Sequence, residues 1–152
     1  SEETDMISCD PFGAATLAQL EINRLTARLT VICLDLHREL GPGAPRRLYE
    51  EALVFELDSA GIGSRRRVEW LVRHRGVRLN TRVAVDLLAD EIIALNLAAA
   101  GDDRRTREGC LRVFVRSAGL PLGLLVDIQT ARPDRVVSTV LPERRTAPVL
   151  PG

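Results

Sequence analysis

The sequence contains no lysine, and all 21 of its basic residues are arginines. Any mechanism that needs a lysine ammonium, whether beside a metal, as a phosphate clamp or as a Schiff-base amine, is therefore excluded within this chain. The acidic residues also number 21, so the formal net charge is zero. The total charge thus gives no reason to expect nucleic acid or a membrane surface as the partner.

Cysteines and long apolar runs are scarce as well. Cys9, Cys33 and Cys110 form no CxxC pair and are odd in number, which is typical of a reducing compartment. No stretch approaches the roughly 18 consecutive apolar residues of a membrane span, and the first residues lack a secretory signal pattern. We therefore expect an intracellular protein, in the cytoplasm or in an organelle interior after removal of a targeting segment.

Residue patterns for metal, cofactor or nucleophilic chemistry are also missing. His37 and His74 have no cysteine or acid at ligand spacing, so they do not form a zinc site. Gly41-Pro42-Gly43 follows a helical pattern and carries no lysine, which excludes a phosphate-binding loop. Neither histidine has a motif-linked serine or cysteine. We expect no metal and no cofactor.

The 152 residues are sufficient for one domain with a real core. Residues 1–14 show no periodicity and are interpreted as a flexible N-terminal arm, followed by a domain at 15–141 and a C-terminal tail at 142–152.

Three segments have helical periodicity. The first begins near Ala15 and ends before Gly41, and the second runs from about Pro45 to Ala60. In the second helix, Leu48, Ala52 and Phe55 are expected to face inward, with Leu57 as a further candidate. The third helix covers residues 104–118. The inward residues expected in the first are Leu25, Leu29, Ile32, Cys33, Leu36 and Leu40, and those in the third are Cys110, Leu111, Phe114, Val115 and Ala118.

The remaining periodic segments are typical of strands. Residues 67–72 and 77–85 predict a hairpin, residues 91–97 a central strand, residues 122–128 a buried strand, and residues 135–141 an edge strand. Because the helix at 104–118 leads into a buried strand, it forms a crossover unit. These elements predict an α/β fold with a mixed sheet.

A strand ending at Asp86, a tight turn and a second strand have the geometry of an acidic metal site. A magnesium nuclease places an Asp, a Glu and a Lys on such strands, with the last two on one face because alternate side chains share a face. Here the positions ten and twelve residues beyond Asp86 are Asn96 and Ala98.

Several runs together resemble the GxxExxxR protein family of the PD-(D/E)XK nuclease superfamily. Leu36-His37-Arg38-Glu39-Leu40-Gly41-Pro42-Gly43 is close to the family's HRELGPG signature, and residues 48–53, 86–88 and 119–127 resemble further family motifs at matching spacing. The resemblance implies a PD-(D/E)XK nuclease-like three-layer fold, with a mixed central sheet flanked by helices in the order α-α-β-β-β-α-β.

The resemblance also marks where the family carries its chemistry. The family's Glu, Arg, Asp, Glu, Lys and Gln fall in turn on Arg46, Glu50, Asp86, Asn96, Ala98 and Cys110. Only Asp86 keeps the family residue, so we expect a catalytically inactive domain in which Arg46 pairs with Asp86. A working metal nuclease remains the alternative only if Asp86 recruits Glu50 or Glu51.

One local basic concentration allows two interpretations. It comprises Arg65, Arg66, Arg67, Arg73, Arg75 and Arg78 of the expected hairpin, supplemented by Arg104, Arg105 and Arg107. These arginines either protect an edge strand from aggregation or form a phosphate-backbone footprint. Trp70 is either a core anchor or an interface hot spot. We expect a structural or accessory subunit that contacts other proteins of a larger assembly, with non-catalytic DNA or RNA binding as the alternative.

Overall fold

The computed structural model describes residues 11–142, with side chains from residue 16 onward. The expected arm and tail therefore lie mostly outside the described residues. Within this described range, no helix is long and apolar enough to cross a membrane. The first helix begins at Pro11 and not near Ala15. Proline suits a first turn because its φ is fixed and its missing N–H has no partner to lose there.

Helices and strands follow the expected order, and a second edge strand completes the sheet. The helices are α2 (Pro11–Leu40), α3 (Arg46–Ser59), α4 (Arg104–Ala118) and the short η1 (Pro133–Arg135). The strands are β1 (Ser64–His74), β2 (Val77–Ala89), β3 (Ile93–Ala98), β4 (Leu122–Asp127) and β5 (Val137–Val140).

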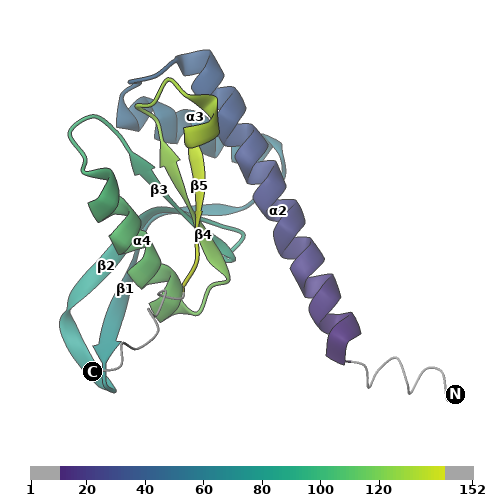
Figure 1. Ribbon diagram of the computed structural model, residues 1–152, viewed down its shortest axis with the longest axis vertical. Helices are drawn as coiled ribbons and strands as arrows, with labels where there is room; N and C mark the ends of the chain where they lie inside the picture. Colours follow the sequence, from purple (N-terminus) through teal and green to yellow (C-terminus); the bar gives the residue numbers. More distant parts are fainter. Residues whose placement is uncertain (1–10, 143–152) are drawn as a thin grey trace, which may run out of the picture.

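The five strands form one mixed sheet in the order β1-β2-β3-β4-β5. Among the described strands only β3 and β4 pair in parallel, and α4 makes the crossover between them, as the sequence predicted. Buried residues form two clusters, one between the sheet and α2 and α3 and the other between the sheet and α4. The domain therefore has three layers, with α4 on one face and α2 and α3 on the other (Figure 1).

The apolar stripe predicted for α2 is confirmed in its C-terminal half. Leu25, Leu29, Cys33 and Leu36 are buried, and Ile32 and Leu40 are partly buried against the same cluster. Towards the N-terminus the helix extends beyond the sheet, and its apolar residues Leu17 and Leu20 are exposed (Figure 1).

The inward face predicted for α3 was wrong in part, because Leu57 is buried and Ala52 is partly buried against the same cluster, but the other two predicted residues are not. Leu48 and Phe55 are exposed, whereas Tyr49, Leu53 and Leu57 are buried. Both sets have helical spacing, and a tertiary contact decides between them. The Tyr49 hydroxyl donates a 2.8 Å hydrogen bond to the Cys33 carbonyl, which fixes α3 against α2.

The hairpin is longer than predicted, and Asp86 does not end its strand. β2 continues to Ala89, and the turn that follows has positive φ at Asp90 and Glu91. Val85 belongs to the cluster under α4, whereas Leu87, two residues on, belongs to the cluster under α2 and α3. Alternate residues of a regular strand share a face, so β2 changes face at Asp86.

Strand β3 is the centre of the sheet and is buried along its whole length, as expected for a continuously apolar strand. Helix α4 has the predicted bounds. Asp103 caps its first turn by accepting a hydrogen bond from the Arg105 N–H, and Gly119 ends it with a left-handed φ of 71°. The central strand and this cap bring Asn96 next to α4.

Candidate functional site

The carboxylate of Asp86 is the centre of a polar cluster between β2, β3, α3 and α4. Its Oδ2 accepts hydrogen bonds from the Leu97 N–H at 2.7 Å, from Arg46 Nη1 at 3.1 Å and from Arg107 Nη2 at 2.5 Å. Only 17% of the Asp86 side chain is exposed. The ion pair predicted between Arg46 and Asp86 is therefore confirmed.

Asn96 of β3 connects this strand to β2 and α4 beside the carboxylate. Its Oδ1 accepts a 3.0 Å hydrogen bond from the Asp86 N–H, and its Nδ2 donates a 3.1 Å hydrogen bond to the Arg107 carbonyl. The side chain is fully buried. A Glu carboxylate at this position would have no N–H to donate to the Arg107 carbonyl. An amide side chain satisfies both contacts, because it carries an acceptor and a donor.

Two members of the cluster were missed by sequence reasoning, namely Asp102 and Arg107. Asp102 forms an ion pair with Arg46, and its Oδ2 also accepts a 2.9 Å hydrogen bond from the Ala99 N–H. Arg107 had been noted only as an additional basic residue. Its position three residues before Cys110 on one helix was the available signal, because residues i and i+3 share a helical face.

The Leu97 carbonyl completes the cluster. It accepts hydrogen bonds from Arg46 Nη1 at 3.2 Å and from Arg107 Nε at 3.1 Å. The two arginines and the two aspartates, Asp86 and Asp102, thus balance each other in charge. Each of these four side chains is about three-quarters buried or more.

The other positions marked by the family resemblance are not part of this cluster. Glu50 has a side chain that is only 5% exposed, and it pairs with Arg66 of β1 at 2.8 Å. Glu51 is exposed. Ala98 is buried under α4, and Cys110 is partly buried. Glu50 is therefore paired with Arg66 and does not join Asp86, as the alternative of a working metal site would require.

The donor set around Asp86 is a poor match for a divalent cation. Within residues 11–142, no group of three or more His, Cys, Asp or Glu side chains is arranged to hold a metal. Magnesium prefers oxygen ligands from one or two carboxylates together with water. Here Asp86 Oδ2 and Asp102 Oδ2 both face guanidinium groups, which repel a cation at close range.

The hairpin arginines divide into paired and unpaired groups. Arg65 donates to both Glu91 oxygens, at 2.7 and 2.9 Å, and this hydrogen bonding lowers the pKa of the Glu91 carboxyl and raises that of Arg65. Arg66 pairs with Glu50. By contrast, four arginines form no ion pair within the described residues. They are Arg67, Arg73, Arg75 and Arg78, and Arg73 donates only to the Gly76 carbonyl.

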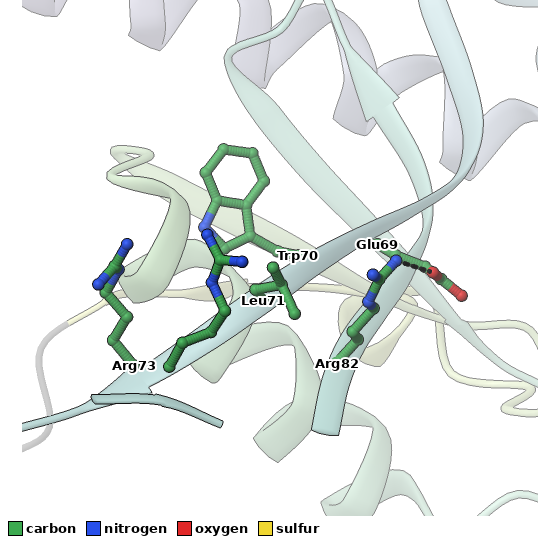
Figure 2. Close-up of a pocket in the computed structure, with 6 residues that line it drawn as sticks. Glu69, Trp70, Leu71, Arg73 and Arg82 are labelled. Carbon is green, nitrogen blue, oxygen red and sulfur yellow. Dashed lines mark hydrogen bonds and ion pairs between the residues drawn. The ribbon is translucent and has the colours of Figure 1, made fainter. Parts of the chain in front are cut away.

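A shallow hollow of about 380 Å³ lies on the hairpin (Figure 2). Its lining residues are Glu69, Trp70, Leu71, Arg73, Arg78 and Arg82. Trp70 is 42% exposed, and its ring packs edge-on against Phe114 of α4 with 6.1 Å between ring centroids. Trp70 therefore contributes to the core beneath it and also leaves surface available to a partner.

Comparison with known proteins identifies the class of the fold. A family model described as PD-(D/E)XK nuclease superfamily matches residues 23–140. The chain therefore belongs to the PD-(D/E)XK nuclease superfamily, which agrees with the three-layer fold expected from the sequence. No curated protein and no solved structure matches the chain.

Proposed function

We propose that this chain is a catalytically inactive nuclease-like domain of the GxxExxxR type that serves as a structural or accessory subunit of a larger protein assembly. The observation that carries the proposal is the double engagement of Asp86 by Arg46 and Arg107. These two guanidiniums take the position in which a metal nuclease would need a cation.

Three further features of the site support the loss of catalysis. Asn96 offers a neutral oxygen, and that oxygen already accepts from the Asp86 N–H. Ala98 carries no amine, and the sequence has no lysine to supply one from elsewhere in the chain. Arg46 adds a positive charge where the family resemblance implies an acid. Each change weakens cation binding, and together they leave no group suited to activate water beside a metal.

The proposed role as a subunit is supported by the surface. Leu17, Leu20 and Val31 are exposed on α2, and Trp70 and Val77 are exposed on the hairpin. Exposed apolar groups of this kind mark interaction surfaces when they gather on one element. A zero net charge also gives no general attraction to nucleic acid.

A cleavage assay tests this proposal. Purified protein should not cut single- or double-stranded DNA or RNA in magnesium or manganese, and calorimetric titration with manganese should detect no specific site. An Asp86→Ala variant serves as the control for contaminating nucleases. Cleavage by the unaltered protein that is lost in Asp86→Ala would show that the site is a working one.

Non-catalytic binding of DNA or RNA is the second candidate, because Arg67, Arg75 and Arg78 lack ion pairs within the described residues. Phosphate contacts of this kind release counterions, so the affinity would fall with a log–log salt slope of about 0.7 to 0.9 per contact. Strongly salt-dependent binding that is lost on replacing these three arginines by alanine would favour this candidate over the first.

A further inference from the structure

The hairpin of β1 and β2 extends past the rest of the sheet and leaves one backbone edge open. β2 pairs with β3 only at residues 87–89, and among the described strands β1 pairs only with β2. The hairpin therefore projects from the layered body, beside α4 (Figure 1). Along residues 68–71 its pairing is regular, so the outer N–H and C=O groups of β1 form a ladder edge there.

The hollow on this hairpin lies where the ladder becomes irregular. The register shifts between Leu71 and Arg73, and such a shift increases the local twist of the two strands. Figure 2 shows Trp70, Leu71 and Arg73 on β1, with Arg82 on β2 held to Glu69. The regular edge of residues 68–71 thus leads directly into a basic and partly apolar hollow.

The arginines of the hollow have little internal compensation. Arg78 makes no ion pair within the described residues, and the hydrogen bond from Arg73 Nη1 to the Gly76 carbonyl is long, at 3.4 Å. Arg82 forms a 3.4 Å ion pair with Glu69, and both side chains are more than half exposed to solvent. Three arginines and one glutamate therefore give the hollow a positive charge on a chain that is neutral as a whole.

We infer that this hollow and the adjoining edge of β1 bind an acidic, extended polypeptide segment of a partner protein. The segment adds a strand along residues 68–71 by main-chain hydrogen bonds. Its carboxylates reach Arg73 and Arg78, and an apolar side chain lies on Leu71 and Trp70. This inference rests on the proposed function and names the kind of partner that such a subunit contacts.

A polypeptide fits these features better than a nucleic acid does. Only a polypeptide backbone can pair with the free ladder edge of β1. Val77 and Leu79, which are exposed on the hairpin, gain nothing from a phosphate backbone. A segment that carries both acidic and apolar side chains matches the arginines and Leu71 that line the same hollow.

Fluorescence anisotropy with a labelled peptide tests the inference. The probe is a fluorescein-labelled peptide of the repeat Glu-Thr-Val-Thr, which as a strand places Glu and Val alternately on one face. We expect saturable binding to the full chain, and at least about tenfold weaker binding of the matched Gln-Thr-Val-Thr peptide, because charged hydrogen bonds to two guanidiniums are lost.

Variants of the protein locate the binding surface. The double variant Arg73→Ala/Arg78→Ala should weaken binding of the acidic peptide at least about tenfold. The matched control is Arg47→Ala/Arg105→Ala, which removes two exposed arginines away from the hairpin and should leave the affinity unchanged. Hydrogen exchange should slow at the outward amides of residues 68–71 when the peptide binds, which a purely electrostatic contact would not cause.

Three results would overturn the inference: no saturable binding, equal loss of binding in both double variants, or tighter binding of single-stranded RNA or DNA than of the acidic peptide at physiological salt. The experiment uses no metal and does not involve Asp86, so it is independent of the cleavage assay. If the natural partner co-purifies equally with Arg73→Ala/Arg78→Ala, the role as a subunit stands and the hairpin inference fails.

Discussion

Replacing Asp86 by alanine should destabilise the fold, and the sign of this change distinguishes an ion-pair cluster from a metal site. Oδ2 of Asp86 accepts from Arg46, Arg107 and the Leu97 N–H. Removal of the carboxylate leaves two guanidiniums close together, with 27% and 24% of their side chains exposed. It also deprives the Leu97 N–H of its acceptor.

The magnitude follows from the burial of these groups. Removing one partner of a fully buried ion pair costs about 3–5 kcal/mol. Here the arginines keep some contact with water, and Arg46 retains Asp102, so a smaller value applies. We expect a loss of about 2–3 kcal/mol, which for a domain of this size lowers the melting temperature by roughly 5–10 °C.

Urea denaturation of the unaltered protein and of Asp86→Ala, in the absence of metal, measures the change. In a carboxylate site built for a cation, removing one acid relieves repulsion in the metal-free protein, so the same substitution would be neutral or stabilising. An unchanged or increased free energy of unfolding for Asp86→Ala would therefore refute the reasoning.

Two controls make the comparison specific. Asp35 pairs with Arg38 at 3.2 Å on the exposed side of α2, so Asp35→Ala should change stability by less than about 0.5 kcal/mol. A double-mutant cycle of Asp86→Ala with Arg107→Met should show a coupling energy of about 1–3 kcal/mol. The double variant should accordingly be more stable than the sum of the single losses predicts.

Two further predictions concern the core. Gly123→Ala should destabilise the fold by about 1–3 kcal/mol, because an added Cβ would lie 2.7 Å from Leu111 Cδ1 and 2.9 Å from Val115 Cγ2. Gly109→Ala is the control, because its Cβ would enter open space, and it should be neutral or stabilising. Thermal melts of both variants measure the difference. Burial raises the pKa of the Cys33 thiol from 9.0 to about 12. The folded state thus holds the protonated thiol, and this contribution to stability is lost as pH rises from about 9 towards 12. Iodoacetamide should label Cys33 only after unfolding, and mass spectrometry can detect this labelling. Labelling of Cys33 in the native protein at the rate seen in urea would contradict this prediction.

The sheet and two of the helices could be predicted because their sequence signals are repeated many times. β3 and β4 are apolar along their length since helices cover both faces of the sheet. The spacing of buried residues in α2 likewise extends over several turns. In α3 the sequence offers two apolar faces, and only the contact between Tyr49 and Cys33 selects one.

The site could be predicted only in part. Arg46 and Asp86 were brought together by the family resemblance, which relates positions that are far apart in the chain. Asp102 lies in a loop and Arg107 on the crossover helix, and their distances from Asp86 depend on how α4 packs on the sheet. No local pattern encodes that packing, so the second arginine and the second aspartate were missed.

On the proposed function, the cluster around Asp86 supplies from within the chain the positive charge that a cation supplies in a metal nuclease. Carboxylates that converge on one point repel each other unless a positive charge lies between them. Arg46 and Arg107 supply that charge from within the chain, so it is present at any metal concentration. Their hydrogen bonds to the Leu97 carbonyl also tie α3 and α4 to the central strand. In the proposed inactive domain these two guanidinium charges join the three layers, and four arginines of the hairpin make no ion pair within the described residues.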